Sequence, residues 1–583
     1  MWKLVIVLTV ASLALAGCKG KSKESPTGGS AVGSSGASGS SGSNGSSGTT
    51  SATTEGTGDL KPVTECPPAL KDVDRGLART IPAGCTTVVE TEYTVEGTLT
   101  IEAGATLRFK PDAALYVGYT APSKLIVRGT KDKPVTFASA GDQAPGAWRG
   151  VHLYSKAARS EISGLVVEYA QVGLDVESPD VTVKDSTFRG SKEVAVRVAD
   201  GVQLAAFSTN TFDKPGALAM TVPPATLSAL DGNVFPADAV LQVRAGRVDA
   251  SGTWKNPGAP LRIAGEVYIE GKAGKATVDI AAGTTLQFES GAAVYVGYSG
   301  DGELKISGTP EAPVSFRSAG EATPGAWRGV VSYSRGTVTV ANAVFEHGGE
   351  ENKGVLRAEG GKVSVTASKF NANVIGVSLD QASELRAFDQ NAFTNNKDIA
   401  VEVMPKHVGS FGEANTYTDQ RIVIHAGKLD KPTTWALQRG ARVEIDGEVY
   451  VDSGGALTLV AGSRYLFTEA GAMYVGYSGT GTLLAKGTPD AAIAFGGVRD
   501  EEGTWKGLEL SNGSASSVLE NVAISNATIG VRVVGAGAAS VNGLSCTKCA
   551  EAALRWDCAS KVKQTGVKAS GGAAKATVAP EGC

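Results

Sequence analysis

Histidine is scarce in this chain, with four among 583 residues, and no cysteine lies between Cys85 and Cys546. Sites built on histidine, or on mixed cysteine and histidine ligands, therefore have little material over most of the sequence. Phosphate-binding and dinucleotide-binding glycine motifs are absent as well. The 55 basic residues nearly balance the 59 acidic residues without forming a basic stripe, so nucleic acid is not an expected partner.

Long apolar runs are also missing, because no segment after the first residues is long enough to span a membrane. Glycine is abundant instead, with 75 residues, and short runs of Val, Ile and Leu alternate with Gly, Asn, Asp and Pro. Amphipathic helical periodicity is rare. This pattern indicates an all-β protein with many short strands.

The N-terminus carries a short apolar run at residues 4–16, which fits the central region of a secretory signal peptide. Leu-Ala-Gly precedes Cys18 at the end of this run and resembles a bacterial lipobox. The resemblance implies that residues 1–17 are removed and that Cys18 is lipidated. Because Lys19 follows the cysteine, the sorting rule of such lipoproteins favours the outer membrane or cell surface. The alternative is an ordinary signal peptide with an incidental cysteine.

Residues 20–58 consist almost entirely of Gly, Ser, Thr and Ala. Such a segment cannot bury a core, so we expect residues 18–60 to form a disordered tether. A Gly/Ser coil of this length has an r.m.s. span of roughly 35 Å. It would hold a folded body away from a membrane surface.

The sequence Tyr-Val-Gly-Tyr occurs at 116–119, 295–298 and 474–477, at intervals of 179 residues. Flanking glycine, phenylalanine and tryptophan residues keep nearly the same interval. A repeat of this kind indicates stacked units rather than one catalytic cleft. The expected organisation is a signal peptide (1–17), a tether (18–60), an N-terminal cap (61–85) and three modules (86–245, 246–425 and 426–583), the last with a cysteine-rich cap.

A shorter period lies within each module. Phe345, Phe370 and Phe393, for example, are spaced by 25 and 23 residues. Strands of two to five residues alternate with turns rich in Gly, Asn and Asp, which is typical of a parallel β-helix. We expect about eight coils of roughly 22 residues per module, which would add roughly 38 Å of length. The junctions at Trp254 and Trp435 could instead separate the modules into three beads.

The end coils of such a solenoid need caps, and the six cysteines after Cys18 lie at its two ends. Their even number in an exported protein indicates disulfides. Cys66 and Cys85 are the expected N-terminal pair, whereas three pairings are open among Cys546, Cys549, Cys558 and Cys583. The alternatives for the last four are a metal site or a redox pair.

Four stretches of module 1 carry a further signal, namely residues 99–109, 125–130, 134–137 and the Trp-Arg-Gly of 148–150. They resemble the repeat of bacterial right-handed parallel β-helix proteins, whose fold is that of the pectin lyases. The resemblance covers most of residues 86–560 and implies a right-handed solenoid. It leaves function open, because this fold carries lyases, hydrolases, adhesins and inert spacers.

A lyase of this fold would need an acidic cluster, often with Ca²⁺, beside an Arg or Lys base, and a hydrolase would need converging carboxylates. The densest candidate is the group Asp175, Glu177, Asp180, Lys184, Asp185 and Arg197. A second candidate, for a metal, is the group Glu346, His347, Glu350 and Glu351. Solvated turns explain both groups, so we expect no catalytic residue and no cofactor, with Ca²⁺ as the one alternative.

One constellation recurs in each module: the tyrosines of the repeated motif, a later tryptophan, and an acid before that tryptophan. An aromatic face beside a carboxylate suits a sugar, which stacks on the ring and hydrogen-bonds the acid. The alternative is that the rings pack inward. The candidate carbohydrate-binding residues are Tyr116, Tyr119, Asp142 and Trp148, then Tyr295, Tyr298, Glu321 and Trp327, then Tyr474, Tyr477, Asp500 and Trp505.

The sequence therefore predicts a lipid-anchored cell-surface protein with a rigid β-helical body and a structural or adhesive role. Its expected partners are the membrane and a polysaccharide or another surface protein. The alternative is a polysaccharide lyase or glycoside hydrolase, which the threefold repeat and the scarcity of converging charge disfavour. A passive envelope protein without a ligand is the third option.

Overall fold

The computed structural model describes residues 65–581 apart from Leu77, Glu351, Ala470, Ala515 and Ala573. The expected signal peptide, Cys18, the tether and Cys583 lie outside the described residues. The chain divides into two compact units, Met1–Leu60 and Lys61–Cys583, and all described strands belong to the second. No helix in the described part of the chain is long and apolar enough to cross a membrane.

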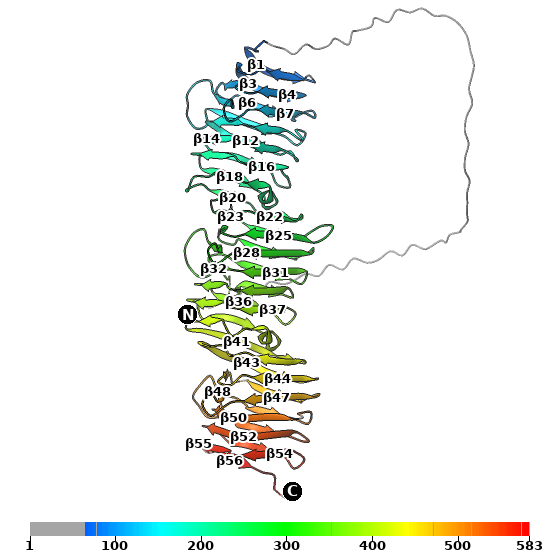
Figure 1. Cartoon of the computed structure of the whole chain (residues 1–583), viewed down its shortest axis with the longest axis vertical. Helices are drawn as coiled ribbons and strands as arrows, with labels where there is room; N and C mark the ends of the chain where they lie inside the picture. The colour runs from blue at the N-terminus through cyan, green and yellow to red at the C-terminus, as the bar shows by residue number, and fades with distance from the viewer. Residues whose placement is uncertain are drawn as a thin grey trace, which may run out of the picture. The chain divides into compact units, whose positions relative to one another are not determined.

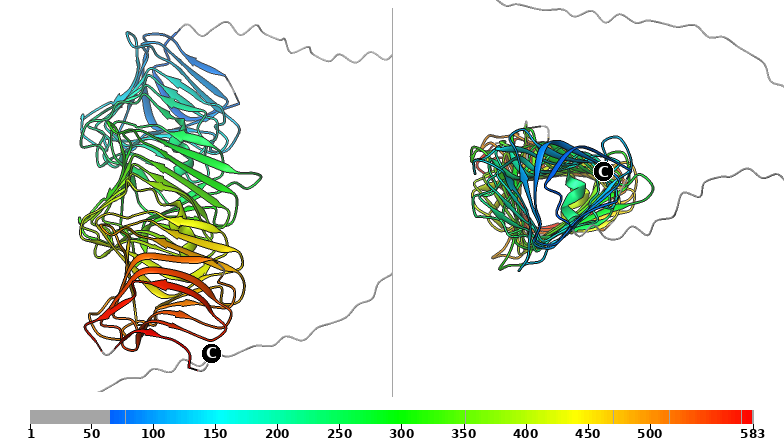
Figure 2. Two further views of the ribbon diagram at one scale, coloured as in Figure 1. Left: turned by 60° about the horizontal axis from the view of Figure 1, so that its bottom comes forward. Right: turned by 90° about the horizontal axis from the view of Figure 1, so that it is seen from above.

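Short parallel strands wind into a right-handed solenoid of about 21 coils (Figure 1). Its strands lie on three faces that surround one core, as the view along the axis shows (Figure 2). Side chains alternate between core and solvent along β4 (Thr98–Glu102) and β25 (Ala276–Ala281), and inward side chains stack on those of the next coil. The predicted fold class is confirmed.

The pairing of strands gives the length of a module in coils. One ladder runs over seven steps through β6 (Ala114–Val117), β9 (Trp148–Leu153), β12 (Ala170–Val176), β15 (Val194–Val198), β18 (Leu218–Val222), β20 (Leu241–Val243), β23 (Leu261–Ile263) and β26 (Thr285–Phe288). In the sequence repeat, β26 is equivalent to β5 (Thr106–Phe109), so the equivalent of β6 is β27 (Ala293–Val296), one face further on.

A module of 179 residues thus makes seven and one-third coils of about 24 residues, whereas the sequence predicted eight coils of roughly 22. The coils are longer because loops such as 140–147, between β8 (Val135–Ser139) and β9, add residues without adding a strand. At about 4.8 Å per coil, one module adds roughly 35 Å of length.

The second junction has the same geometry. A second ladder of seven steps runs through β27, β30 (Gly329–Tyr333), β33 (Gly354–Glu359), β36 (Ile375–Leu379), β39 (Ile399–Val403), β41 (Gln420–Leu429), β43 (Ala441–Val451) and β45 (Arg464–Phe467). Pairing is therefore continuous across both junctions, and the alternative of three separate beads is wrong. A 3-10 helix that begins at a proline precedes each junction, η1 (Pro224–Ala229) and η2 (Pro405–Ser410).

Equivalent strands of the three modules face the same side of the solenoid although they belong to different ladders. Figure 1 draws on one side β4 and β7 (Lys124–Arg128), then β25 and β28 (Gly302–Ser307), then β44 (Gly455–Leu459) and β47 (Gly481–Lys486). The turn that follows each Tyr-Val-Gly-Tyr leads into one of these strands, namely β7, β28 or β47. The three turns therefore lie in a row along the solenoid.

Buried asparagines hold many of the other turns. The amide oxygen of Asn415 accepts a hydrogen bond from the Asn391 backbone N–H one coil away at 3.0 Å. The side-chain amide of Asn391 in turn donates to the Val365 carbonyl at 3.0 Å. Such asparagine ladders pair backbone groups that a buried turn would otherwise leave unsatisfied.

Both ends of the solenoid carry disulfides. The predicted Cys66–Cys85 bond closes the first coil, where β1 (Ala69–Arg75) pairs with β3 (Thr86–Glu96). At the other end Cys546 is joined to Cys549, and Cys558 is also disulfide-bonded. The last strands, β54 (Lys561–Thr565), β55 (Lys568–Ser570) and β56 (Lys575–Val578), carry exposed lysines, which discourage pairing of this open edge with another chain.

Candidate functional site

The three tryptophans of the predicted carbohydrate site lie inside the solenoid. Trp148, Trp327 and Trp505 are each 1% exposed. They stack on Phe109, Phe288 and Phe467 with ring centroids 4.0, 4.1 and 4.3 Å apart. Each indole N–H donates to a backbone carbonyl at 2.8 Å. The tryptophans therefore do not belong to an outward patch, because their rings fill the core and their polar atoms are already paired.

The predicted acids are exposed but stand apart from the tyrosines. Asp142 and Glu321 lie in the loops before the buried tryptophans. Asp500 forms an ion pair with Lys548 at 2.6 Å and accepts a hydrogen bond from Asn526 at 3.1 Å. Among the described residues, no hydrogen bond joins any of the three acids to the repeated tyrosines.

A different carboxylate accompanies the first tyrosine of each motif. Glu92, Glu266 and Glu448 lie one coil before it and accept hydrogen bonds from its hydroxyl group. The distances are 3.2 Å for Tyr116, 3.4 Å for Tyr295 and 3.5 Å for Tyr474. Each carboxylate is therefore part of the outer face that carries the motif.

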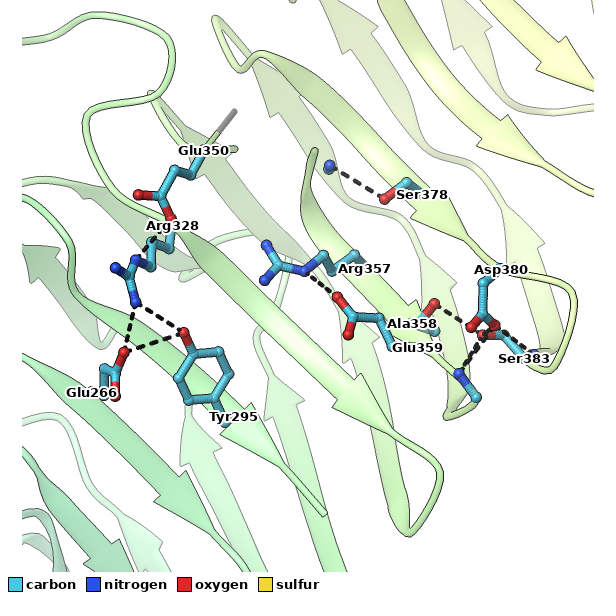
Figure 3. A network of polar contacts seen from close by, with 12 residues as sticks. Glu266, Tyr295, Arg328, Glu350, Arg357, Ala358, Glu359, Ser378, Asp380 and Ser383 are labelled. Atoms are coloured by element: carbon cyan, nitrogen blue, oxygen red, sulfur yellow. Dashed lines mark hydrogen bonds and ion pairs between the residues drawn. The ribbon is translucent and has the colours of Figure 1, made fainter. Parts of the chain in front are cut away.

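Each of these carboxylates is also paired with the cation that directly follows the buried tryptophan. The pairs are Arg149 with Glu92, Arg328 with Glu266 and Lys506 with Glu448. Figure 3 shows the second of these sites, where Arg328 lies between Glu266 and Glu350 at 2.6 and 2.7 Å and also donates to the hydroxyl of Tyr295. The ion pairs neutralise the acids and fix the tyrosine hydroxyls.

The second tyrosine of each motif projects into solvent. Tyr119, Tyr298 and Tyr477 are 59, 60 and 60% exposed. The glycine before each of them has a positive φ, and a Cβ there would collide with the backbone of the next coil. Only glycine fits this close approach, which explains the Gly of Tyr-Val-Gly-Tyr and fixes where the exposed ring stands.

A further carboxylate holds the turn after each exposed tyrosine. In module 2 the buried Glu270 accepts hydrogen bonds from the backbone N–H groups of Ser299 and Gly300. In module 3 the buried Asp452 accepts from the Ser478 N–H at 2.8 Å and from its hydroxyl. Burial alone would raise the pKa of Asp452, but these hydrogen bonds outweigh it and hold the pKa below its usual value. The exposed tyrosines are thus held on rigid turns.

Neighbouring tyrosines complete three outer clusters. Tyr119 lies 4.9 Å from Tyr154, Tyr298 lies 5.0 Å from Tyr333, and Tyr477 lies 5.9 Å from Tyr450, all between ring centroids. Cluster 1 consists of Tyr116, Tyr119 and Tyr154; cluster 2 of Tyr268, Tyr295, Tyr298 and Tyr333; and cluster 3 of Tyr450, Tyr474 and Tyr477. Each is a set of partly exposed rings beside a paired carboxylate.

Sequence reasoning missed Tyr154, Tyr268, Tyr333 and Tyr450, together with the glutamates. A signal was available in part, because modules 2 and 3 contain Glu-x-Tyr at 266–268 and 448–450. Both residues of that pattern point to the outer face of the coil that precedes the motif. The motif alone could not show which residues stack beside it in the next coil.

Module 1 also brings together part of the predicted acidic group. Asp175 lies one strand from His152, whose Nδ1 is 3.4 Å from its carboxylate, and 3.0 Å from the Arg197 guanidinium. Burial lowers the pKa of His152, so the ring is neutral near pH 7. Asp185, by contrast, accepts a hydrogen bond from Thr209 in a turn, and Glu177 and Asp180 are exposed.

The other histidines have structural partners. His407 is buried, and its ring nitrogens hydrogen-bond backbone atoms of Met404 and Ser383. His425 pairs with Glu402 at 2.6 Å. Near His347, Glu350 is engaged by Arg328, while Glu351 lies outside the described residues. In the part of the chain that the structure describes, no group of three or more His, Cys, Asp or Glu side chains is placed to hold a metal ion.

Comparison with known proteins supports the fold. The family model described as a pectate-lyase like beta helix domain matches residues 82–175. This stretch spans much of module 1 and includes Tyr116, His152 and Asp175. None of the curated proteins compared with the chain matches it.

Proposed function

We propose that this protein is a glycan-binding surface protein that holds carbohydrate at its outer tyrosine clusters. The observation that carries the proposal is the threefold recurrence of an exposed tyrosine on a turn fixed by glycine and by a carboxylate. A folded protein gains no stability from an aromatic ring that is 60% exposed, as Tyr298 is. A rigid, exposed aromatic ring beside hydrogen-bonding groups suits the C–H face and the hydroxyls of a sugar.

The cell-surface part of the proposal rests on the lipobox-like sequence at Cys18. Lipidation there would anchor the β-helical body, and residues 18–60 would space it from the membrane. Cys18→Ser should move the protein from the membrane fraction to the soluble fraction. A variant that still sediments with membranes after alkaline carbonate washing would contradict the anchor.

Binding can be tested with the detergent-solubilised full-length protein on a panel of immobilised xylan, mannan, β-glucan, chitin and uronate polymers. We expect retention on at least one polymer, and a loss of retention when Tyr119, Tyr298 and Tyr477 are all replaced by alanine. Val234→Ala is the matched control, because Val234 is also 59% exposed but lies outside the clusters. Equal retention of the triple variant and the wild type would contradict the proposal.

Glycan cleavage at cluster 1 is a second candidate function. The observation in its favour is the neutral His152 between Asp175 and the Tyr116 and Tyr154 rings, which no other module repeats, since Val331 and Glu509 take its place. A neutral imidazole can act as a general base. Release of reducing ends or of unsaturated sugars from the panel polymers, abolished by His152→Ala, would support it.

A further inference from the structure

The three clusters lie in a row on one side of the solenoid. Each occupies the corner between equivalent strands, β6 and β7, β27 and β28, or β46 (Ala472–Val475) and β47, and Figure 1 places the second strand of each pair on the same side. Successive clusters are one module apart, or roughly 35 Å along the axis. The first and third are therefore separated by roughly 70 Å.

A shallow groove reaches cluster 3 along this row. It has a volume of about 770 Å³ and is lined by Met404, Ala426, Gly427, Gly447, Tyr450 and Lys506, among others. Ala426, Gly427 and Gly447 come from successive coils and give it a floor almost without side chains. The groove therefore runs across coils, along the axis, and ends at a tyrosine of the cluster.

The same small residues precede cluster 2. Ala245, Gly246 and Gly265 occupy the positions equivalent to Ala426, Gly427 and Gly447. A Cβ on Gly265 would press on Ala245, as one on Gly447 would press on Ala426. Both junctions therefore keep the surface low immediately before a tyrosine cluster.

The charges beside the clusters are balanced. Glu92 is paired with Arg149, and Glu448 with Lys506, while Arg328 is shared between two carboxylates. None of the three clusters thus presents a net positive charge from these groups. Such a surface offers no electrostatic attraction to an acidic polymer.

From this geometry we infer that one extended, uncharged polysaccharide chain binds lengthwise across all three clusters. The inference rests on the proposed glycan binding and adds its direction, its valency and the class of polymer. Each cluster would contribute a weak contact, and linkage through one chain would raise the overall affinity on the order of 10²-fold or more. A chain shorter than the spacing of two clusters would gain nothing.

The test uses size-fractionated oligosaccharides of xylan, mannan and β-glucan with the detergent-solubilised full-length protein. We expect affinity to rise in two steps, when the extended chain first spans roughly 35 Å and again near 70 Å. The single variants Tyr119→Ala, Tyr298→Ala and Tyr477→Ala separate the sites. Loss of an outer cluster should remove the step near 70 Å, whereas loss of the middle cluster should remove the step near 35 Å and leave the longer one.

The outcomes separate this inference from the function on which it rests. Retention without dependence on chain length, or identical length profiles for the three variants, would overturn the lengthwise mode and leave glycan binding intact. A preference for uronate polymers that disappears at high salt would overturn the uncharged class. Failure of every polymer on the panel to bind would overturn both.

Discussion

The inner and outer faces of the solenoid carry aromatic residues at almost the same interval but for different reasons. Inside, Trp327 stacks on Phe288 and its indole N–H is paired with a backbone carbonyl. Outside, Tyr298 stands in solvent on a turn held by the buried Glu270. Recurrence in the sequence is equally strong for both rings. It therefore shows only that a position matters in every module, and burial decides whether it matters for folding or for the surface.

The comparison also predicts how replacement should act from the core outward. Inner positions should cost stability and leave binding per folded molecule unchanged. Outer positions should do the reverse. Positions between the two, such as the carboxylates that hold the turns, should affect both.

The largest effect is expected at an inner tryptophan. Trp327→Ala removes a buried ring that contacts neighbouring coils, and such a change costs about 3–5 kcal/mol of unfolding free energy. Chemical denaturation of the wild type and the variant measures this cost. Glycan retention per folded molecule should not change, and a selective loss of retention with unchanged stability would reverse the assignment of Trp327 to the core.

The N-terminal disulfide should come next. Cys66 and Cys85 are separated by 19 residues and close the first coil. Removing a bond that closes a loop of this size costs roughly 3 kcal/mol, through the greater freedom of the unfolded chain. Cys66→Ser with Cys85→Ser should lower the melting temperature and open the first coil to protease before the interior. Unchanged protease resistance at that end would contradict a capping role.

Much of the fold could be predicted from the sequence, because a solenoid repeats its physical requirements. Short apolar strands, turns with Gly and Asn, and the spacing of Phe345, Phe370 and Phe393 all follow from stacking like residues in successive coils. The number of coils was not predictable in the same way. Loops such as 140–147 lengthen a coil without changing the periodic pattern of the strands.

The candidate site was predictable only in part. The motif tyrosines were found because they recur as a block, and the exposed ones, Tyr119 among them, are indeed at the surface. The choice of acid failed because sequence proximity to Trp148 suggested Asp142. The acid that contacts Tyr116 is Glu92, which lies 24 residues earlier and reaches the tyrosine only through coil stacking.

A turn-holding carboxylate should have an intermediate effect. Asp452→Asn weakens hydrogen bonds that a charged group accepts from Ser478, which we expect to cost about 1–2 kcal/mol. Because the pKa of Asp452 is lowered in the folded state, its contribution is present above its unfolded pKa and is lost as pH falls through the folded value. Melting temperatures from pH 2 to pH 7 measure this. Asp446→Asn, an exposed acid on the same strand, is the control.

The smallest effect is expected for an ion pair on the outer face. A hydrogen bond to Glu402 raises the pKa of His425 above its usual value. The contribution of this pair to stability is therefore complete below pH about 6.5 and is lost as pH rises through the higher folded pKa. Melting curves of the wild type and His425→Gln should differ most below pH 6 and converge above pH 8. His407 also titrates, with a pKa that burial lowers, but it is common to both proteins and cancels in the difference. A difference that grows with rising pH would mean that Glu402 does not hold His425 as a cation, and the outer face would then lack even this modest contribution.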